Sequence, residues 1–222
     1  MRAIKNVIFD LDGTLIDSSD GVVAAVNYAL QKTGDSLPPP EEIRSFIGYS
    51  LDEMFPHFSK APTDILHRYF QEKANDLVVG ATVALPEAEE TLALLHERGY
   101  RLAIATTKVV RNIDGILDKL NWRRYFEVYS GGNEVKNVKP DPEIFRLTLS
   151  RLGAKRSETV VIGDTINDIL GARAIPMTAI AVASPFEKRE KVMSAHPDFF
   201  VESILGVVDL LETIIPGMED PK

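Results

Sequence analysis

The sequence predicts an α/β fold: a doubly wound parallel sheet with helices on both faces, and an all-helical insertion after the first strand. Three observations support this prediction. Short apolar runs alternate with helical patterns along most of the 222 residues. The runs contain no polar residue, which is typical of strands buried on both faces of a parallel sheet. Between about residues 16 and 85, by contrast, only helical patterns occur.

Five apolar runs are expected to form the strands of the sheet. Each run is short and is bounded by turn residues, which favours a buried strand over a helix. The stretches between them have apolar side chains spaced three and four apart, such as Ala88, Leu92 and Leu95, as amphipathic helices do. The five runs are residues 7–9, 102–105, 160–162, 179–183 and, more weakly, 199–201.

Three apolar stripes at helical spacing predict the insertion. The prolines at 38–40 separate its first helix from the next. We expect residues 16–85 to form a helical domain inserted into a core of residues 1–15 and 86–222; an α+β domain with a helical end is the alternative. The first stripe is Val22, Val26 and Leu30, the second is Leu51, Met54, Phe55 and Phe58, and the third is Ile65, Tyr69 and Leu77.

Composition narrows the possible partners. The net charge of -8 and the pI near 5.1 disfavour nucleic acid as a main partner, because an acidic surface repels a phosphate backbone. The chain has no cysteine, which rules out disulfides, thiolate catalysis and zinc–thiolate sites. It has no signal-peptide pattern and no apolar run of transmembrane length. We therefore expect a cytoplasmic protein with no membrane partner; the pattern leaves the oligomeric state open.

A first pair of acids follows the first strand, in Asp10-Leu11-Asp12-Gly13-Thr14. In extended backbone Asp10 and Asp12 lie on the same side of the chain, where two carboxylates repel each other unless a cation or a shared proton relieves them. A simple Asp-Gly turn is the alternative. A calcium-binding EF-hand fits poorly, because Gly13 and the residues after it do not match the spacing of that loop.

A second pair, Asp164 and Asp168, follows the strand at 160–162 and opens a helix. Either acid could be the N-cap of that helix, which would leave the other without a role. A divalent cation held by Asp10, Asp164 and the backbone carbonyl of Asp12 would relieve both pairs, and hard oxygen ligands suit Mg²⁺. The sequence therefore predicts a magnesium site where the strands end.

Hydroxyl and lysine side chains are also expected at this edge of the sheet. Thr106, Thr107 and Lys108 follow the second strand, and Lys139 precedes a helical pattern. Open parallel sheets bind ligands at the carboxyl ends of their strands, so these side chains are expected near the four acids. For Lys139 the alternative is an ordinary surface lysine.

These residues resemble the haloacid dehalogenase superfamily. The DLDGT segment, the strand that ends in Thr106, the KPDP segment and the GDTIND segment match its four motifs in order, across essentially the whole chain. The resemblance implies a Rossmann-like core, and it implies that the helical insertion is the family's cap. Within the superfamily the chain looks most like phosphoglycolate phosphatases. Thr107 departs from the frequent asparagine, and Ile175-Pro176 departs from the usual Ala-Gly pattern.

The resemblance also implies the roles of the motif residues. It makes Asp10 the nucleophile that forms an aspartyl-phosphate, and Asp12 the acid that protonates the leaving oxygen. Thr106 and Lys139 would bind the phosphoryl oxygens. The remaining expectations are substrate contacts from Gly13, Thr14 and Thr107, and a Mg²⁺ ion held by Asp10, Asp12, Asp164 and Asp168, with Asp12 contributing its backbone carbonyl.

The expected activity is magnesium-dependent hydrolysis of a small phosphomonoester resembling phosphoglycolate. An inorganic pyrophosphatase of the same branch and a phosphosugar mutase share these motifs, so both remain open. A phospho-aspartate receiver is the non-enzymatic alternative. The cap is expected to select the substrate, with Arg44 and Tyr49 as candidates because they flank Gly48 in a polar connection; ordinary exposed loop residues are the alternative for both.

Overall fold

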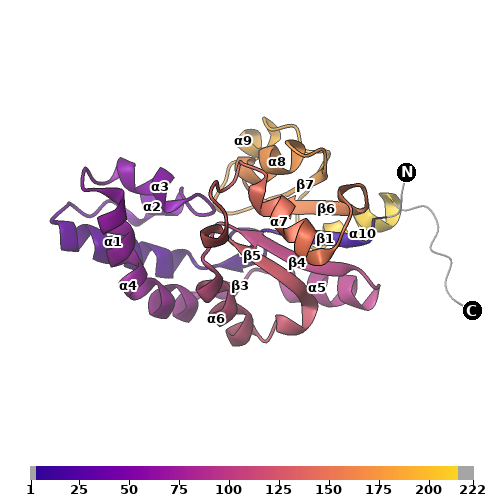
Figure 1. Ribbon diagram of the computed structural model, residues 1–222, viewed down its shortest axis with the longest axis horizontal. Helices are drawn as coiled ribbons and strands as arrows, with labels where there is room; N and C mark the ends of the chain where they lie inside the picture. Colours follow the sequence, from indigo (N-terminus) through magenta and orange to yellow (C-terminus); the bar gives the residue numbers. More distant parts are fainter. Residues whose placement is uncertain (1–3, 215–222) are drawn as a thin grey trace, which may run out of the picture.

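A layered α/β core and a lobe of helices at one end of it make up the chain (Figure 1), whose residues 4–214 are described by a computed structural model. The core is built on a six-stranded sheet in which every pair of neighbours is parallel, in the order β5-β4-β1-β6-β7-β8. The predicted parallel sheet is confirmed. Its strands are β1 Asn6–Phe9, β4 Arg101–Thr106, β5 Phe126–Gly131, β6 Thr159–Gly163, β7 Thr178–Val182 and β8 Phe199–Val201.

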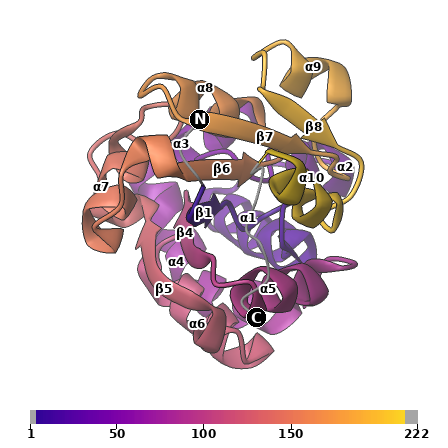
Figure 2. The same ribbon diagram turned by 90° about the vertical axis from the view of Figure 1, so that its right-hand side faces the viewer.

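Helices cover both faces of this sheet (Figure 2). One group of helices covers each face. Within β1, Ile8 packs under the first of these groups, whereas Val7 and Phe9 pack under the second, because successive side chains of a strand point to opposite faces. All three are fully buried, which explains why the strand reads as an unbroken apolar run. The first group is α7 Glu143–Leu152, α8 Ile166–Arg173 and α9 Arg189–Met193; the second is α5 Ala88–Glu97, α6 Val110–Leu120 and α10 Gly206–Ile214.

The helical lobe is formed by α1 Ser19–Thr33, α2 Pro40–Arg44, α3 Leu51–Met54 and α4 Thr63–Ala81. It has a hydrophobic cluster of its own, separate from the two clusters of the core. The first two predicted stripes contribute to that cluster. The prediction of the third stripe was wrong by one residue. The buried face of α4 is Leu66, Phe70, Ala74 and Val78, and the predicted Ile65, Tyr69 and Leu77 are only half-buried beside it.

Two strand features escaped prediction. A short ribbon, in which β2 Ile16–Asp17 pairs antiparallel with β3 Val83–Ala84, joins the lobe to the core, although no strand was expected there. Two residues per strand are too few to show an alternating pattern. Strand β5 lies at the edge of the sheet and is only partly buried, so its sequence mixes polar and apolar residues and lacks the apolar run used to find the other strands.

Strand β1 lies at the switch point of the sheet, where the side on which later strands are added reverses. From β1 the chain later adds β4 and β5 on one side and β6, β7 and β8 on the other. Ligands of open α/β sheets bind outside the carboxyl ends of the strands at such a switch point. The first three and last eight residues of the predicted core, 1–3 and 215–222, lie outside the described residues.

Candidate active site

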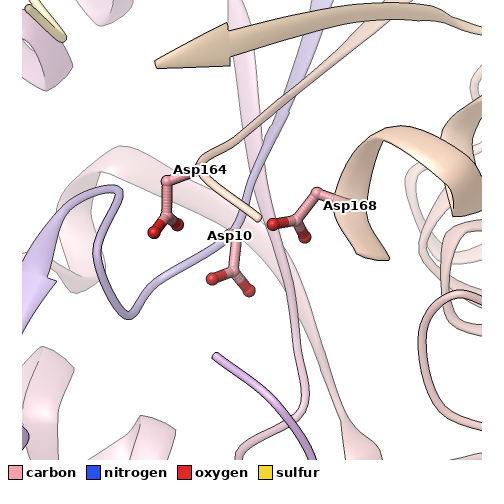
Figure 3. Close-up of side chains that lie close together, drawn as sticks. All are labelled: Asp10, Asp164 and Asp168. Carbon is pink, nitrogen blue, oxygen red and sulfur yellow. The ribbon is translucent and has the colours of Figure 1, made fainter. Parts of the chain in front are cut away.

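Three aspartates converge at the switch point. Asp10 directly follows β1, Asp164 directly follows β6, and Asp168 lies in the first turn of α8. One carboxylate oxygen from each lies within 4.8 Å of the others, and the three side chains point toward one another (Figure 3). All three are buried. The two acidic motifs therefore meet at one edge of the sheet, as expected from the sequence.

Asp168 has a second contact that fixes its position. Thr165, and not an aspartate, is the N-cap of α8: its hydroxyl accepts from the Asp168 N–H, and Asp168 Oδ2 accepts from the Thr165 N–H at 3.1 Å. This reciprocal arrangement is a capping box. It rules out the alternative in which Asp164 or Asp168 is the N-cap of the helix. The cap occupies Oδ2 and leaves Oδ1 of Asp168 facing the cluster.

Lys139 is not a surface lysine. Its Nζ donates to Asp10 Oδ1 at 2.7 Å and to Asp168 Oδ1 at 2.6 Å, and its side chain is only 2% exposed. Burial lowers the pKa of the Lys139 ammonium, but the Asp10 and Asp168 carboxylates together raise that pKa above its ordinary value. Lys139 therefore stays charged and bridges two of the three converging acids.

Two acids of the cluster, Asp10 and Asp164, have raised pKa values. Burial, with the neighbouring Asp168 carboxylate, raises the pKa of Asp10 to about 7, although Lys139 opposes the shift. Burial also raises the pKa of Asp164 well above its ordinary value, and the nearby carboxylates raise it further. The Thr14 hydroxyl donates to Asp164 Oδ1 at 2.7 Å, and the Thr14 and Ser184 hydroxyls both oppose the rise of this pKa. Within residues 4–214, no group forms a hydrogen bond of ordinary geometry with the buried Asp164 Oδ2.

The backbone at Gly13 comes close to this unpartnered oxygen. A Cβ at position 13 would lie 2.1 Å from Asp164 Oδ2, and Gly13 has a φ of +79°. Both the close approach and the left-handed conformation require glycine. The turn after β1 therefore packs directly against Asp164.

The charge and the donor set of the site fit a divalent cation. Counting Asp12, four buried carboxyl groups face two ammonium groups, those of Lys139 and Lys108, so ionisation of all four acids would leave two negative charges for a cation to balance. Three of the acids offer converging oxygen atoms, the ligand type that Mg²⁺ prefers. Within residues 4–214, Asp164 Oδ2 has no hydrogen-bond partner and is free to bind a cation. The Asp12 side chain is not among the converging groups, as expected if this residue contributes its backbone.

Asp12 has partners of its own that sequence reasoning missed. Lys108 Nζ lies 2.9 Å from Asp12 Oδ2, and the Ser18 hydroxyl donates to Asp12 Oδ1 at 2.5 Å. Lys108 also donates to the Ser18 hydroxyl at 3.0 Å. Lys108 was expected near the acids, but its pairing was not, and nothing in the pattern singled out Ser18. Thr106, at the buried end of β4, accepts from the Lys108 N–H at 3.4 Å.

A cavity of about 240 Å³ lies between the helical lobe and the core, and Asp12 is in its wall. Tyr49 and Thr107 line it, and the Thr107 hydroxyl donates to the Gly48 carbonyl at 3.4 Å. Arg44 is not among the lining residues. Its guanidinium is turned toward Ser19 and Asp20 instead. Of the two predicted cap residues, only Tyr49 is brought to the cavity.

Tyr49 also connects the lobe to the core. Its hydroxyl donates to Glu187 and accepts from Lys191. The Lys191 Nζ also lies over the Tyr49 ring, 4.7 Å from its centroid. Lys191 Nζ lies 3.0 Å from Glu187 Oε1, and the Glu187 side chain is only 6% exposed. Burial, followed by the hydrogen bond to Glu187, raises the pKa of Tyr49. The residues after β7 thus contact the lobe, through Tyr49 and through Phe186, which packs against the hydrophobic cluster of the lobe.

Comparison with known proteins places the chain among enzymes. Residues 7–182 match the family described as haloacid dehalogenase-like hydrolase. The chain belongs to this family. It is 33% identical over 211 residues to pyrophosphatase PpaX of Bacillus pumilus, covering 94% of this chain and 96% of that protein. It is 29% identical over 236 residues to phosphoglycolate phosphatase of Salmonella typhimurium, covering 95% of this chain and 94% of that one.

The solved structures agree with the family assignment. A haloacid dehalogenase-like hydrolase from Streptococcus pneumoniae has a TM-score of 0.86 and 25% identity, covering 95% of this chain and 99% of that one. The predicted family and the predicted enzyme class, a phosphatase of the haloacid dehalogenase type, are confirmed. Among residues 4–214, no helix is both long enough and apolar enough to span a bilayer.

Proposed function

We propose that the protein hydrolyses a small phosphomonoester with the help of Mg²⁺, through a phosphorylated Asp10. The observation that carries the proposal is the arrangement of Asp10, which is buried, bridged by Lys139 and grouped with Asp164 and Asp168. A carboxylate beside a fixed ammonium and a divalent-cation site has what it needs to attack phosphorus. We further propose that residues 16–85 act as a cap and residues 1–15 and 86–222 as the catalytic core.

In the first step, Asp10 forms a bond to phosphorus while the bond between phosphorus and the ester oxygen breaks. Asp12, held by Lys108 and Ser18, gives its proton to the departing oxygen. In the second step a water molecule attacks the same phosphorus, Asp12 takes the proton of that water, and the bond to Asp10 breaks. Inorganic phosphate leaves and both acids return to their starting states.

Lys139 and Thr106 would bind the phosphoryl oxygens as negative charge moves onto them. The Lys139 ammonium is already in place beside the Asp10 carboxylate. The backbone at Gly13 and Thr14, which form the turn after β1, would hold the phosphate on its other side, with Thr107 contributing from the end of β4. These contacts position the phosphorus in front of Asp10 and exclude water from the first step.

Asp10, Asp164 and Asp168 would hold the Mg²⁺ ion, with the Asp12 carbonyl as a further ligand. When bound, Mg²⁺ supplies the positive charge that allows an anionic phosphate to approach an anionic nucleophile. The unpartnered oxygen of Asp164 and the raised pKa of Asp10 support this assignment. The cytoplasmic location stays a prediction from the sequence.

Pyrophosphate hydrolysis is the second candidate, favoured by the identity to the Bacillus pumilus pyrophosphatase. The decisive experiment measures phosphate release from phenyl phosphate, phosphoglycolate and pyrophosphate, with Mg²⁺ and after chelation. We expect Mg²⁺-dependent turnover of the monoesters and none by Asp10→Asn. Undiminished hydrolysis after exhaustive chelation would rule out the metal assignment. Preference for pyrophosphate would favour the second candidate, and an isomerised product from a sugar phosphate added to the panel would indicate a mutase.

A further inference from the structure

We infer that the leaving group of the substrate is uncharged, with an apolar body and a neutral hydrogen-bonding group. This inference rests on the proposed phosphatase function and adds the class of substrate. The names of the relatives do not settle that class, because a pyrophosphatase and a phosphoglycolate phosphatase match this chain at 33% and 29% identity. The evidence is the wall of the cavity that adjoins Asp12, since the proton donor and the leaving group must meet there.

The cap side of this cavity is largely apolar. Phe70 and Val78 of α4, Met54 of α3 and Ile47 of the preceding connection all line it, and all four are buried. Such a wall stabilises an apolar ligand by removing its surface from water. It offers no compensation to a charge, whose transfer from water is costly unless it is paired.

The positive groups at the cavity already have negative partners. Among residues 4–214, the lining side chains able to carry a positive charge are Lys108 and His67. Lys108 is paired with Asp12 at 2.9 Å, and His67 Nε2 lies 3.3 Å from Asp52 Oδ1. A substrate carboxylate at either position would compete with the resident carboxylate and be repelled by it. The same repulsion would act on the second phosphate of pyrophosphate.

Asn112 offers a polar side chain to the cavity. The Asn112 side chain, near the start of α6, lines the cavity and is 5% exposed. No protein group within residues 4–214 hydrogen-bonds its amide. A buried amide normally has a partner, so the Asn112 amide is available to a ligand. As both donor and acceptor, it suits a hydroxyl or an amide of the leaving group.

Matched esters test the charge preference on the full-length enzyme with Mg²⁺. Phosphoglycolate is compared with the phosphate ester of glycolamide, which has the same shape without the charge. Pentyl phosphate is compared with 4-hydroxybutyl phosphate, which has the same number of non-hydrogen atoms. We expect kcat/KM for the glycolamide ester to exceed that for phosphoglycolate by about tenfold or more, and 4-hydroxybutyl phosphate to be preferred over pentyl phosphate by about 3- to 10-fold.

Two variants assign the preference to the cavity. Asn112→Leu should remove the preference for 4-hydroxybutyl phosphate and leave pentyl phosphate within about twofold. Gln71→Arg changes an exposed residue that lines the cavity on α4, and therefore leaves the core intact. The added cation should raise kcat/KM for phosphoglycolate by about tenfold, the effect of a charged hydrogen bond, with little change for its amide.

The outcomes separate this inference from the proposed function. Turnover of phosphoglycolate that equals or exceeds turnover of its amide in the unmodified enzyme would overturn the inference while leaving the phosphatase intact. A preference for 4-hydroxybutyl phosphate that survives Asn112→Leu would overturn the role of that amide. Absence of Mg²⁺-dependent turnover for every ester, phenyl phosphate included, would overturn the proposed function and this inference together.

Discussion

Replacement of Lys139 by methionine should destabilise the protein and nearly stop catalysis. Lys139 contacts Asp10 and Asp168 at 2.7 and 2.6 Å, and none of the three side chains is more than 4% exposed. Methionine is close to lysine in length and volume, so the change removes the charge and little volume; it also removes the ammonium that lies 5.4 Å from the centroid of the Phe145 ring. Two carboxylates are then left buried without their shared cation.

Removal of one partner from a buried ion pair costs about 3–5 kcal/mol. In a chain of this length each kcal/mol of lost unfolding free energy lowers Tm by about 2–4 °C. The Tm of the metal-free variant should therefore be lower by roughly 6–20 °C. Mg²⁺ should restore part of this loss, because it neutralises the same carboxylates. The loss of one preorganised electrostatic group should also lower kcat by about 10²–10³-fold.

Thermal unfolding with and without Mg²⁺, and turnover of phenyl phosphate, measure both effects. Lys136→Met is the matched control, since Lys136 lies three residues earlier and is exposed. Lys108 is unsuitable as a control because it holds Asp12. A Lys139→Met enzyme with the Tm and turnover of the control would refute both the buried ion pair and the phosphoryl-binding role.

Three further predictions follow from the same contacts. Asp10→Asn should lower kcat by at least about 10³-fold, whereas Asp12→Asn should impair an alkyl phosphate more than an aryl phosphate; equal impairment would contradict the proton-transfer role. Because the pKa of Asp10 is raised to about 7, the folded metal-free protein binds a proton that the unfolded chain has lost, so its stability should fall as pH rises toward 8. The Tm increase caused by Mg²⁺ should therefore be larger at pH 8 than at pH 6, and an equal increase would contradict the assignment. Tyr49→Phe removes the hydroxyl that joins the lobe to Glu187 and Lys191, so we expect KM to rise about 3- to 10-fold with kcat nearly unchanged; an unaltered KM would show that this contact does not hold the cap closed.

The acidic cluster was predictable because it depends on local order along the chain. An apolar run that ends in aspartate places that aspartate at the carboxyl end of a buried strand, and parallel strands bring such ends together. Asp10 and Asp164 were located in this way. Asp168 was expected on one helix face with Asp164, whereas Asp164 lies before the N-cap Thr165 and only Asp168 belongs to α8. No long-range information was required beyond the parallel arrangement of the sheet.

The pairing of Asp12 depends on contacts that local order does not encode. Ser18 lies six residues after Asp12, and Lys108 is 90 residues from Ser18. The three meet because the ribbon of β2 and β3 turns the chain back after the first motif, and neither of these two-residue strands has a recognisable pattern. The same reasoning applies to Arg44, whose charge and loop position suggested substrate contact but whose guanidinium is held by Asp20.

Helix α4 shows why the chemistry of this protein was easier to predict than its selectivity. Two neighbouring stripes of α4 have apolar residues at helical spacing, and the predicted stripe contains larger side chains than the Ala74 of the buried one. Burial against α1 decides between them, and the stripe that is buried places Phe70 and Val78 at the cavity. A rotation of α4 by one residue would give the cavity a different wall without moving any of the four acids. In the proposed function, substrate choice would therefore depend on helix packing in the lobe, whereas phosphoryl transfer would depend on strand ends in the core.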